Sequence, residues 1–250
     1  MKRDDFASTP TLRVRDLHKQ FTLHLRGATV LPVLRGVCLD VRAGECVALV
    51  GPSGEGKSTL VKCLYGSYAA DAGQMLLHTA DGDVDLALAS PQQLLRLRRA
   101  QISYVSQFLR AVPRVGAIDV VAERLLEATQ LPPGSELDDV AHALALDAAH
   151  AQVRSLFARL KLPSSLWELP PATFSGGEQQ RVNVARGLVQ PSTLLLLDEP
   201  TASLDAANRR VVIELIEEAK AAGSAVVGIF HDAEVRDAVA TRCVSLRNEP

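Results

Sequence analysis

The chain has 250 residues, enough for one or two domains that bury a sizeable core. Its 27 Lys and Arg residues stand against 29 Asp and Glu residues, so the basic excess of a dedicated nucleic-acid binder is absent. No apolar run reaches the roughly 18 residues of a membrane-spanning helix, and the N-terminus carries acids where a signal peptide would be apolar. We therefore expect a cytoplasmic protein that neither inserts into a membrane nor binds nucleic acid.

The first third of the chain is typical of short strands joined by turns. Hydrophobic and polar residues alternate along Leu12–Leu17, Phe21–Leu25 and Val37–Val41, which is the pattern of half-buried strands. The apolar run Cys46–Val50 follows a glycine turn and ends at another glycine, as a fully buried central strand does. The residues from Lys57 to about Tyr65 predict a helix.

The middle third changes in character. From Ile118 to about Leu162 the chain is rich in Ala, Leu, Glu and Arg, with hydrophobic residues at helical spacing. Two proline-containing turn clusters interrupt it, Leu131–Gly134 and Leu169–Pro171. This pattern predicts a helical subdomain over residues 108–174, inserted into an α/β core.

The last third alternates between helices and strands. A helix over Glu178–Val189 leads to a strand over Leu194–Leu197, and a helix over Ala206–Ala222 leads to a strand over Ala225–Phe230. Strand–helix–strand repetition predicts a parallel sheet with right-handed crossovers. The predicted fold class is therefore α/β, with an antiparallel N-terminal part and an inserted helical subdomain.

The four cysteines show no C-x-x-C spacing. They stand at Cys38, Cys46, Cys63 and Cys243 in a long chain without a recognisable export signal. This usage favours free, buried thiols over disulfides or a metal site.

The strongest chemical signal is an eight-residue glycine-rich segment that begins at Gly51. It matches G-x-x-x-x-G-K-[ST] and lies between a predicted strand and a predicted helix. Its glycines allow backbone N–H groups to turn around phosphates, Lys57 can reach the β- and γ-phosphates, and the Ser58 hydroxyl can bind Mg²⁺. The alternative is a chance glycine-rich turn. The predicted phosphate-binding residues are Gly51, Pro52, Ser53, Gly54, Glu55, Gly56, Lys57, Ser58 and Thr59.

Two carboxylates follow the leucine-rich strand that ends at Leu197. Ligands of open α/β sheets bind outside the carboxyl ends of the strands. Asp198 is therefore predicted to hold the same Mg²⁺ as Ser58, and Glu199 to accept a proton from an attacking water. The alternative is a pair of solvated acids at a strand end.

A second glycine pair opens the helix that begins near Glu178. The segment Ser175–Arg181 reads S-G-G-E-Q-Q-R, and its S-x-x-E spacing by itself could be only a capping box. With the preceding Phe174 it resembles the L-S-G-G-Q signature of the ABC ATPase family, with a Glu in place of the Gln at Glu178. That resemblance assigns Ser175, Gly176, Gly177 and Glu178 to nucleotide binding.

Four further positions follow the same family in order. The resemblance implies that Gln107 and His231 sense the γ-phosphate, with Gln107 also near the metal, that Asp205 lies in the D-loop, and that Phe21 stacks on adenine. Taken singly, Gln107 could be a strand-end amide, His231 a core histidine and Phe21 core packing. The catalytic set implied is Lys57, Gln107, Glu199 and His231, and the metal set is Ser58, Gln107 and Asp198.

The ABC resemblance covers about 210 residues and implies a single nucleotide-binding domain over residues 1–250. Its P-loop NTPase (RecA-like) core would comprise 1–107 and 175–250, and its cofactors would be ATP and Mg²⁺. The resemblance implies a head-to-tail dimer in which Ser175 and Gly177 contact ATP of the opposing protomer. Two bound ATP molecules could close such a dimer and hydrolysis could release it.

Within that family the chain looks most like the PhnL family of the phosphonate carbon–phosphorus lyase system. The likeness is carried by Leu64–Tyr68, Ser106–Arg114, Thr173–Gly187 and Gly228–Arg236. It implies support for formation of ribose 1-phosphonate 5-triphosphate, with PhnG, PhnH, PhnI and PhnJ-like soluble subunits and a PhnK-like sister ATPase or a second copy as dimer partner.

Two other functions remain open. One is the ATP-binding subunit of a membrane transporter of the lipoprotein-release, macrolide-export or phosphonate-transport type, and the other is a module that binds nucleotide without hydrolysis. The resemblance implies that Gln107–Arg114, which follows the predicted γ-phosphate sensor, faces the partner. This segment carries Phe108, Leu109, Arg110 and Arg114, and aromatic residues and arginines suit interface anchors. The alternative is ordinary core packing with solvated arginines.

Overall fold

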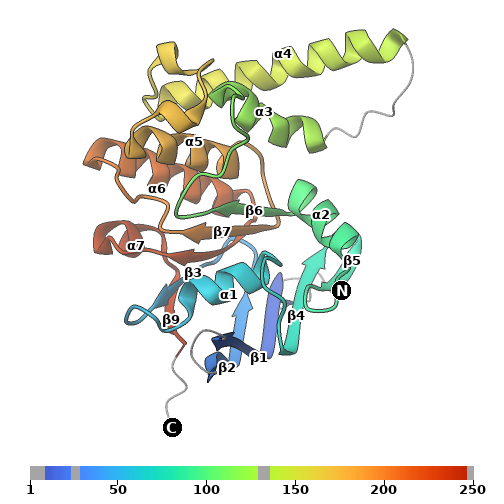
Figure 1. Cartoon of the computed structure of the whole chain (residues 1–250), viewed down its shortest axis with the longest axis vertical. Helices are drawn as coiled ribbons and strands as arrows, with labels where there is room; N and C mark the ends of the chain where they lie inside the picture. Colours follow the sequence, from blue (N-terminus) through green and yellow to red (C-terminus); the bar gives the residue numbers. More distant parts are fainter. Residues whose placement is uncertain (1–8, 24–28, 129–135, 247–250) are drawn as a thin grey trace, which may run out of the picture. The chain divides into compact units, whose positions relative to one another are not determined.

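The computed structural model describes residues 9–23, 29–128 and 136–246, and these form two compact units. The sheet unit contains the residues up to Tyr104, Ser192–Asp198 and the residues from Ala219 onward. The helical unit contains Val105–Pro191 and Glu199–Glu218 (Figure 1).

An antiparallel sheet with the order β2-β1-β4-β5 forms one part of the sheet unit. Its strands are β1 (Leu12–Leu23), β2 (Thr29–Val41), β4 (Ala72–Thr79) and β5 (Gly82–Asp85). The two expected strands near the N-terminus are joined in the single strand β1, because the chain stays paired with β2 through register shifts rather than turning. Asp16, with φ of 47°, lies at this irregularity.

A parallel sheet with the order β6-β7-β8-β3-β9 forms the other part. Its strands are β3 (Cys46–Val50), β6 (Ile102–Val105), β7 (Leu194–Asp198), β8 (Ala225–Ile229) and β9 (Arg242–Ser245). Strands β7 and β8 are buried at every position, which explains their unbroken apolar sequences. The predicted α/β architecture, a parallel sheet with an antiparallel N-terminal sheet and helices, is confirmed.

Among its described residues, the sheet unit contains the helices α1 (Lys57–Leu64), α2 (Pro91–Ala100) and α7 (Ala233–Val239). Helix α1 directs Leu60, Val61, Cys63 and Leu64 into a hydrophobic core that includes residues of both sheets. Helix α2 begins at a capping box in which Ser90 and Gln93 satisfy each other's backbone N–H groups.

The expected burial of the four thiols is only half right. Cys46 and Cys63 are buried, but Cys38 and Cys243 are exposed. Cys38 lies on β2 between the buried residues Val37 and Leu39, so its side chain points to the opposite face of the sheet. Cys243 lies on β9, an edge strand with no buried position.

The helical unit is built on α3 (Ala117–Ala128), α4 (Glu136–Arg159), α5 (Gly176–Leu188) and α6 (Ala206–Ala221), of which α6 belongs to it up to Glu218. Helices α3, α4 and α5 pack on one another, with Val121, Val153 and Phe157 fully buried. Arg159 donates two hydrogen bonds to Glu218, of 2.6 and 3.0 Å, and so joins α4 to α6.

The described part of residues 108–174, the expected helical subdomain, contains α3, α4 and the short 3₁₀ helices Ser164–Leu166 and Pro171–Thr173. The second expected proline cluster leads into the latter 3₁₀ helix, while the first, at residues 131–134, lies outside the described residues. The proposed division of the chain at 107 and 175 stays a prediction. None of the helices in the described part of the chain combines the length and apolar composition needed to cross a bilayer.

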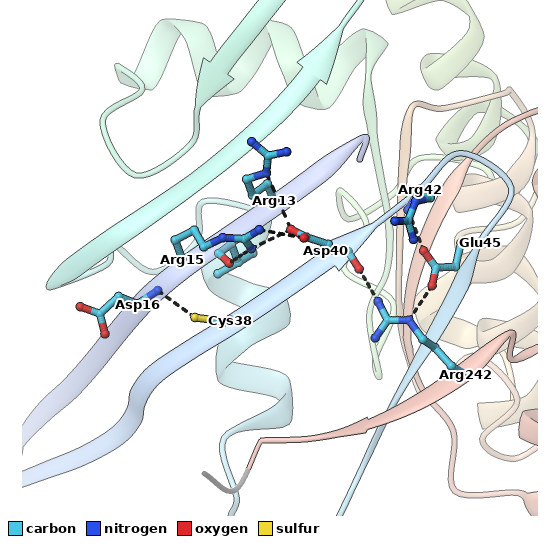
Figure 2. A network of polar contacts seen from close by, with 9 residues as sticks. Arg13, Arg15, Asp16, Cys38, Asp40, Arg42, Glu45 and Arg242 are labelled. Carbon is cyan, nitrogen blue, oxygen red and sulfur yellow. Dashed lines mark hydrogen bonds and ion pairs between the residues drawn. The ribbon is translucent and has the colours of Figure 1, made fainter. Parts of the chain in front are cut away.

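A polar network connects the two sheets of the sheet unit (Figure 2). Arg15 donates two hydrogen bonds of 2.7 Å to the Asp40 carboxylate, across the β1–β2 pair. Arg242 on β9 donates to the Asp40 carbonyl oxygen and, at 2.6 Å, to the Glu45 carboxylate, which also accepts the Arg42 backbone N–H. The network therefore joins the edge of the antiparallel sheet to a strand of the parallel sheet.

This network predicts a small, pH-dependent contribution to stability. The hydrogen bond from Arg15 lowers the pKa of the Asp40 carboxyl below its ordinary value, so the contribution is present at neutral pH and is lost as pH falls through that lowered value. Asp40→Asn should cost less than about 1 kcal/mol at pH 7, because the pair is partly exposed to solvent. Urea unfolding from pH 7 down to pH 3 should show the gap between variant and wild type closing below about pH 4.

Asp147→Asn, at an exposed position of α4, is the matched control and should leave stability unchanged at every pH. A gap between Asp40→Asn and wild type that stays constant to pH 3 would contradict the prediction.

Candidate nucleotide-binding and hydrolysis site

The glycine-rich loop joins β3 to α1, as predicted. Gly51, Gly54 and Gly56 have φ values of 130°, 84° and 94°, which residues with a side chain rarely adopt. A Cβ atom on Gly51 would meet only the Glu55 carboxylate, which can move aside, so it is the backbone conformation that favours glycine there. The loop leads directly into the N-terminus of α1, whose partial positive charge favours phosphate.

Lys57, the first residue of α1, bends back over this loop. Its ammonium group donates to the carbonyl oxygens of Gly51 and Pro52, at 2.8 Å each. The charge is thereby held at the loop itself, where bound phosphates would need it.

The Asp198 carboxylate is held at the end of β7 by hydrogen bonds to both of its oxygens. Only 3% of the residue is exposed. The Ser58 hydroxyl donates to one oxygen at 3.1 Å, and the Tyr104 hydroxyl donates to the other at 3.4 Å. The structure thus brings together the Ser58 hydroxyl and the Asp198 carboxylate. Mg²⁺ prefers oxygen ligands, so these two side chains fit a magnesium ion.

Glu199 follows Asp198 in the chain and has an unusual backbone. Its φ is 56°, a left-handed conformation that is costly for a residue with a side chain. The Gln107 amide donates to its carboxylate at 3.4 Å. Within the helical unit, the predicted base and the predicted γ-phosphate sensor therefore contact each other. The role of Gln107 as a metal ligand stays a prediction.

Ser175 caps α5, and both halves of the capping box are present. The Ser175 backbone N–H and hydroxyl donate to the Glu178 carboxylate at 2.8 and 2.7 Å, and the Glu178 N–H donates back to the hydroxyl at 3.4 Å. The hydrogen bonds from Ser175 lower the pKa of the Glu178 carboxyl, which is therefore ionised at neutral pH. The capping function expected from the S-x-x-E spacing is confirmed, and it places a negative charge beside the predicted signature.

The segment Ser203–Asp205 packs against the start of α5. A Cβ atom on Gly177 would lie 2.9 Å from the Ser203 carbonyl oxygen, so glycine permits this approach. Asp205 caps α6 by accepting the Asn208 N–H at 2.8 Å, and this hydrogen bond, with smaller contributions from nearby Lys161 and Arg181, lowers the pKa of the Asp205 carboxyl. The signature and the predicted D-loop of one chain therefore form a single packed element.

Two predicted positions lie at the surface of the sheet unit. His231 is exposed just after β8, so the alternative interpretation of His231 as a core histidine is wrong. Phe21 is partly exposed on β1, where its ring meets the Tyr68 ring edge-to-face at 5.3 Å and the Lys19 ammonium lies 5.4 Å from its centre. These contacts are compatible with Phe21 packing against its neighbours and with Phe21 stacking on adenine, so adenine binding by Phe21 stays a prediction.

Comparison with known proteins identifies the family. The family model described as "ABC transporter" matches residues 34–202. The lipoprotein-releasing system ATP-binding protein LolD of Novosphingobium aromaticivorans is 35% identical over 227 residues, which cover 90% of this chain and 91% of that protein. This chain belongs to the ABC transporter ATPase family.

Other relatives in this ABC family carry the names of different transport systems. The hemin import ATP-binding protein HmuV of Streptomyces coelicolor is 36% identical over 90% of this chain and 72% of its own length. The macrolide export ATP-binding/permease protein MacB of Bordetella avium is 33% identical over 91% of this chain. The chain spans about a third of the length of the MacB relatives it matches.

A solved ABC cassette has the same fold. A dimeric ATP-binding cassette in a post-hydrolysis state, bound to ADP and phosphate, superposes with a TM-score of 0.79 at 23% identity, over 94% of each chain. These relatives support an ATP-binding ABC subunit, and they do not support the closer likeness to PhnL.

Tyr104 and two residues of α5 contact predicted site residues or the backbone beside them, although no sequence pattern assigns them a role. Tyr104 binds Asp198, while Gln180 and Asn183 contact the backbone beside Glu199 and Gln107. The spacing of Gln180 and Asn183 on the apolar face of α5 is a signal for burial, but it does not indicate which groups they meet. Tyr104 could be placed only after the order of β6 and β7 was known.

Tyr104→Phe should raise the Mg²⁺ concentration needed for half-maximal ATP binding by about fivefold, because one hydrogen bond that orients Asp198 is lost, at a cost of about 1 kcal/mol. Titration of a fluorescent ATP analogue at a series of Mg²⁺ concentrations measures the shift. Tyr65→Phe is the control and should show no shift, because the Tyr65 ring only packs against the Tyr104 ring, with the centroids 4.8 Å apart. Equal Mg²⁺ dependence of Tyr104→Phe and wild type would remove Tyr104 from the site.

Proposed function

We propose that this chain is the ATP-hydrolysing subunit of a membrane transporter of the lipoprotein-release or macrolide-export type. The observation that carries the catalytic part is the pair of contacts Ser58–Asp198 and Gln107–Glu199, each joining two predicted motifs far apart in the sequence. The transporter part is supported by the likeness to LolD, which extends over nearly all of both chains.

In the proposed reaction, the loop from Gly51 to Ser58 holds the ATP phosphates and Lys57 offsets their charge. Ser58 and Asp198 would hold Mg²⁺, which supplies further positive charge to the phosphates when bound. Glu199 orients a water molecule and accepts its proton while the water oxygen bonds to the γ-phosphorus. The bond from that phosphorus to the bridging oxygen breaks, and ADP leaves.

The same proposal includes a head-to-tail dimer, with a second copy or a sister ATPase. Ser175, Gly176 and Gly177 would contact ATP held by the opposing protomer, with Asp205 beside them. Gln107 and His231 would register the γ-phosphate, so the dimer closes around two ATP molecules and opens after hydrolysis. The dimeric solved cassette is similar in fold to this chain, which is compatible with such an arrangement.

The partner-facing segment after Gln107 has an exposed apolar surface. Phe108 is 73% and Val112 is 63% exposed, and exposed hydrophobic residues that gather in one short segment suit a contact site. Beside them lies a cavity of about 250 Å³ in the helical unit. Its lining combines apolar, basic and acidic side chains from Arg110, Ala111, Val112, Val115, Asp119, Val120, Glu123 and Arg186. We propose that a membrane subunit contacts this surface.

A second candidate is the carbon–phosphorus lyase role, with soluble partners in place of a membrane subunit. The observation in its favour is the sequence resemblance carried by Ser106–Arg114 and Gly228–Arg236. The named relatives favour the transporter instead. The identity of the co-purifying partner decides between the two.

Glu199→Gln should lower ATP turnover by about 10²- to 10⁴-fold, the usual contribution of a general base, while ATP binding is retained. Turnover is measured with the partners present, and nucleotide binding is measured separately. Equal turnover in variant and wild type would exclude Glu199 as the base, and absence of turnover in the wild-type assembly would favour a module that binds without hydrolysis.

Phe108→Ala combined with Arg110→Ala should reduce partner capture from membranes solubilised in detergent at least tenfold, because an aromatic and an arginine anchor are both removed. Val140→Ala, at an exposed hydrophobic position of α4 outside this surface, is the matched control and should capture normally. Mass spectrometry identifies the captured proteins. Unchanged capture by the double variant would refute the contact surface, and exclusive recovery of soluble phosphonate-processing subunits would replace the transporter by the second candidate.

A further inference from the structure

Helix α5 carries two buried amides on one face. Gln180 and Asn183 are three residues apart and are each only 4% exposed, among the apolar side chains Val182, Val184 and Ala185. A buried amide is costly unless its N–H groups find acceptors. The partners of these two amides are therefore informative.

The Gln180 amide holds the backbone at the predicted catalytic base. It donates to the carbonyl oxygen of Pro200 at 2.9 Å and to that of Glu199 at 3.4 Å. Because the backbone of Glu199 is left-handed, with φ of 56°, this residue needs support from its surroundings to keep its conformation. A glutamine that binds both carbonyl oxygens at this point supplies such support.

The Asn183 amide holds the backbone beside the predicted sensor. It donates to the carbonyl oxygen of Ser106, the residue before Gln107, and approaches the Gln180 side-chain oxygen at 3.5 Å. One helical turn further along, a Cβ atom on Gly187 would collide with the Val105 side chain. Glycine therefore lets α5 lie close enough to this strand end for Asn183 to reach it.

We propose that Gln180 and Asn183 are positioning residues that set the Gln107–Glu199 contact for ATP hydrolysis, an inference that rests on the proposed function of Glu199. The two amides hold the two backbone segments from which Gln107 and Glu199 project. Because α5 begins at Ser175–Gly177, the same rigid helix links the signature to the base of its own chain. A misplacement of about 1 Å at a reacting group can cost roughly a hundredfold in rate.

The test is a double-mutant cycle. Gln180→Met keeps the length of the side chain and removes the donor, and it should lower kcat at least tenfold while KM for ATP changes less than threefold. In the Glu199→Gln background, the same substitution should have almost no further effect, because the position of an absent base does not matter. Single-turnover measurements over hours capture the slow rates, and thermal unfolding checks that each variant is folded.

Asn183→Ala is a second, smaller change and should lower kcat in the same way, so the inference stays testable if Gln180→Met does not fold. Gln152→Met is the matched control, since Gln152 also donates to a backbone carbonyl oxygen, that of Val189 at the far end of α5. It should leave kcat unchanged.

Wild-type kcat in both Gln180→Met and Asn183→Ala would overturn the inference while leaving the proposed function intact. An equal loss of rate from Gln180→Met in the wild-type and Glu199→Gln backgrounds would also overturn it, because that is the result of a general structural effect. Absence of ATP turnover in the wild-type assembly would instead overturn the proposed function on which the inference rests.

Discussion

The hydrogen bond between Ser58 and Asp198 is the interaction on which the catalytic interpretation depends. It joins the first turn of α1 to the carboxyl end of β7, two segments separated by 140 residues. A carboxylate that is 3% exposed is costly to bury, and it is stable here because Ser58 and Tyr104 donate to its two oxygens. The same arrangement offers oxygen ligands where the phosphate-binding loop begins its helix.

The helical unit adds a second group of polar contacts around Glu199. Buried amides from α5 meet carbonyl oxygens on both sides of the Gln107–Glu199 contact. Ser175 and Glu178 start the same helix with a capping box, so a local stabilising device and a proposed nucleotide contact use the same residues. The negative charge of Glu178 distinguishes this signature from one that carries a neutral glutamine.

The buried strands and the motifs attached to them were the most predictable features. Cys46–Val50 is observed as β3, and Leu194–Leu197 is observed within β7, because a fully buried strand is an unbroken apolar run. Two predictions were wrong: that the residues of β1 form two strands, and that Cys38 and Cys243 are buried. Register shifts depend on pairing partners, which local alternation does not reveal. The exposure of Cys38, in contrast, agrees with the alternation of Val37–Val41. The PhnL likeness rested on short segments, and the relatives found do not support it.

By itself, the sequence determined the chemistry that is local in the chain. Spacing established the glycine-rich loop, the capping box at Ser175 and the acid pair at Asp198, since these depend on residues next to one another. Only the tertiary structure decided which distant groups meet. Strand order and helix packing set three kinds of hydrogen bond. These run from the Tyr104 hydroxyl to Asp198, from the Gln107 amide to Glu199, and from the α5 amides to backbone carbonyl oxygens. Packing of that kind depends on many residues at once, and no local pattern records it.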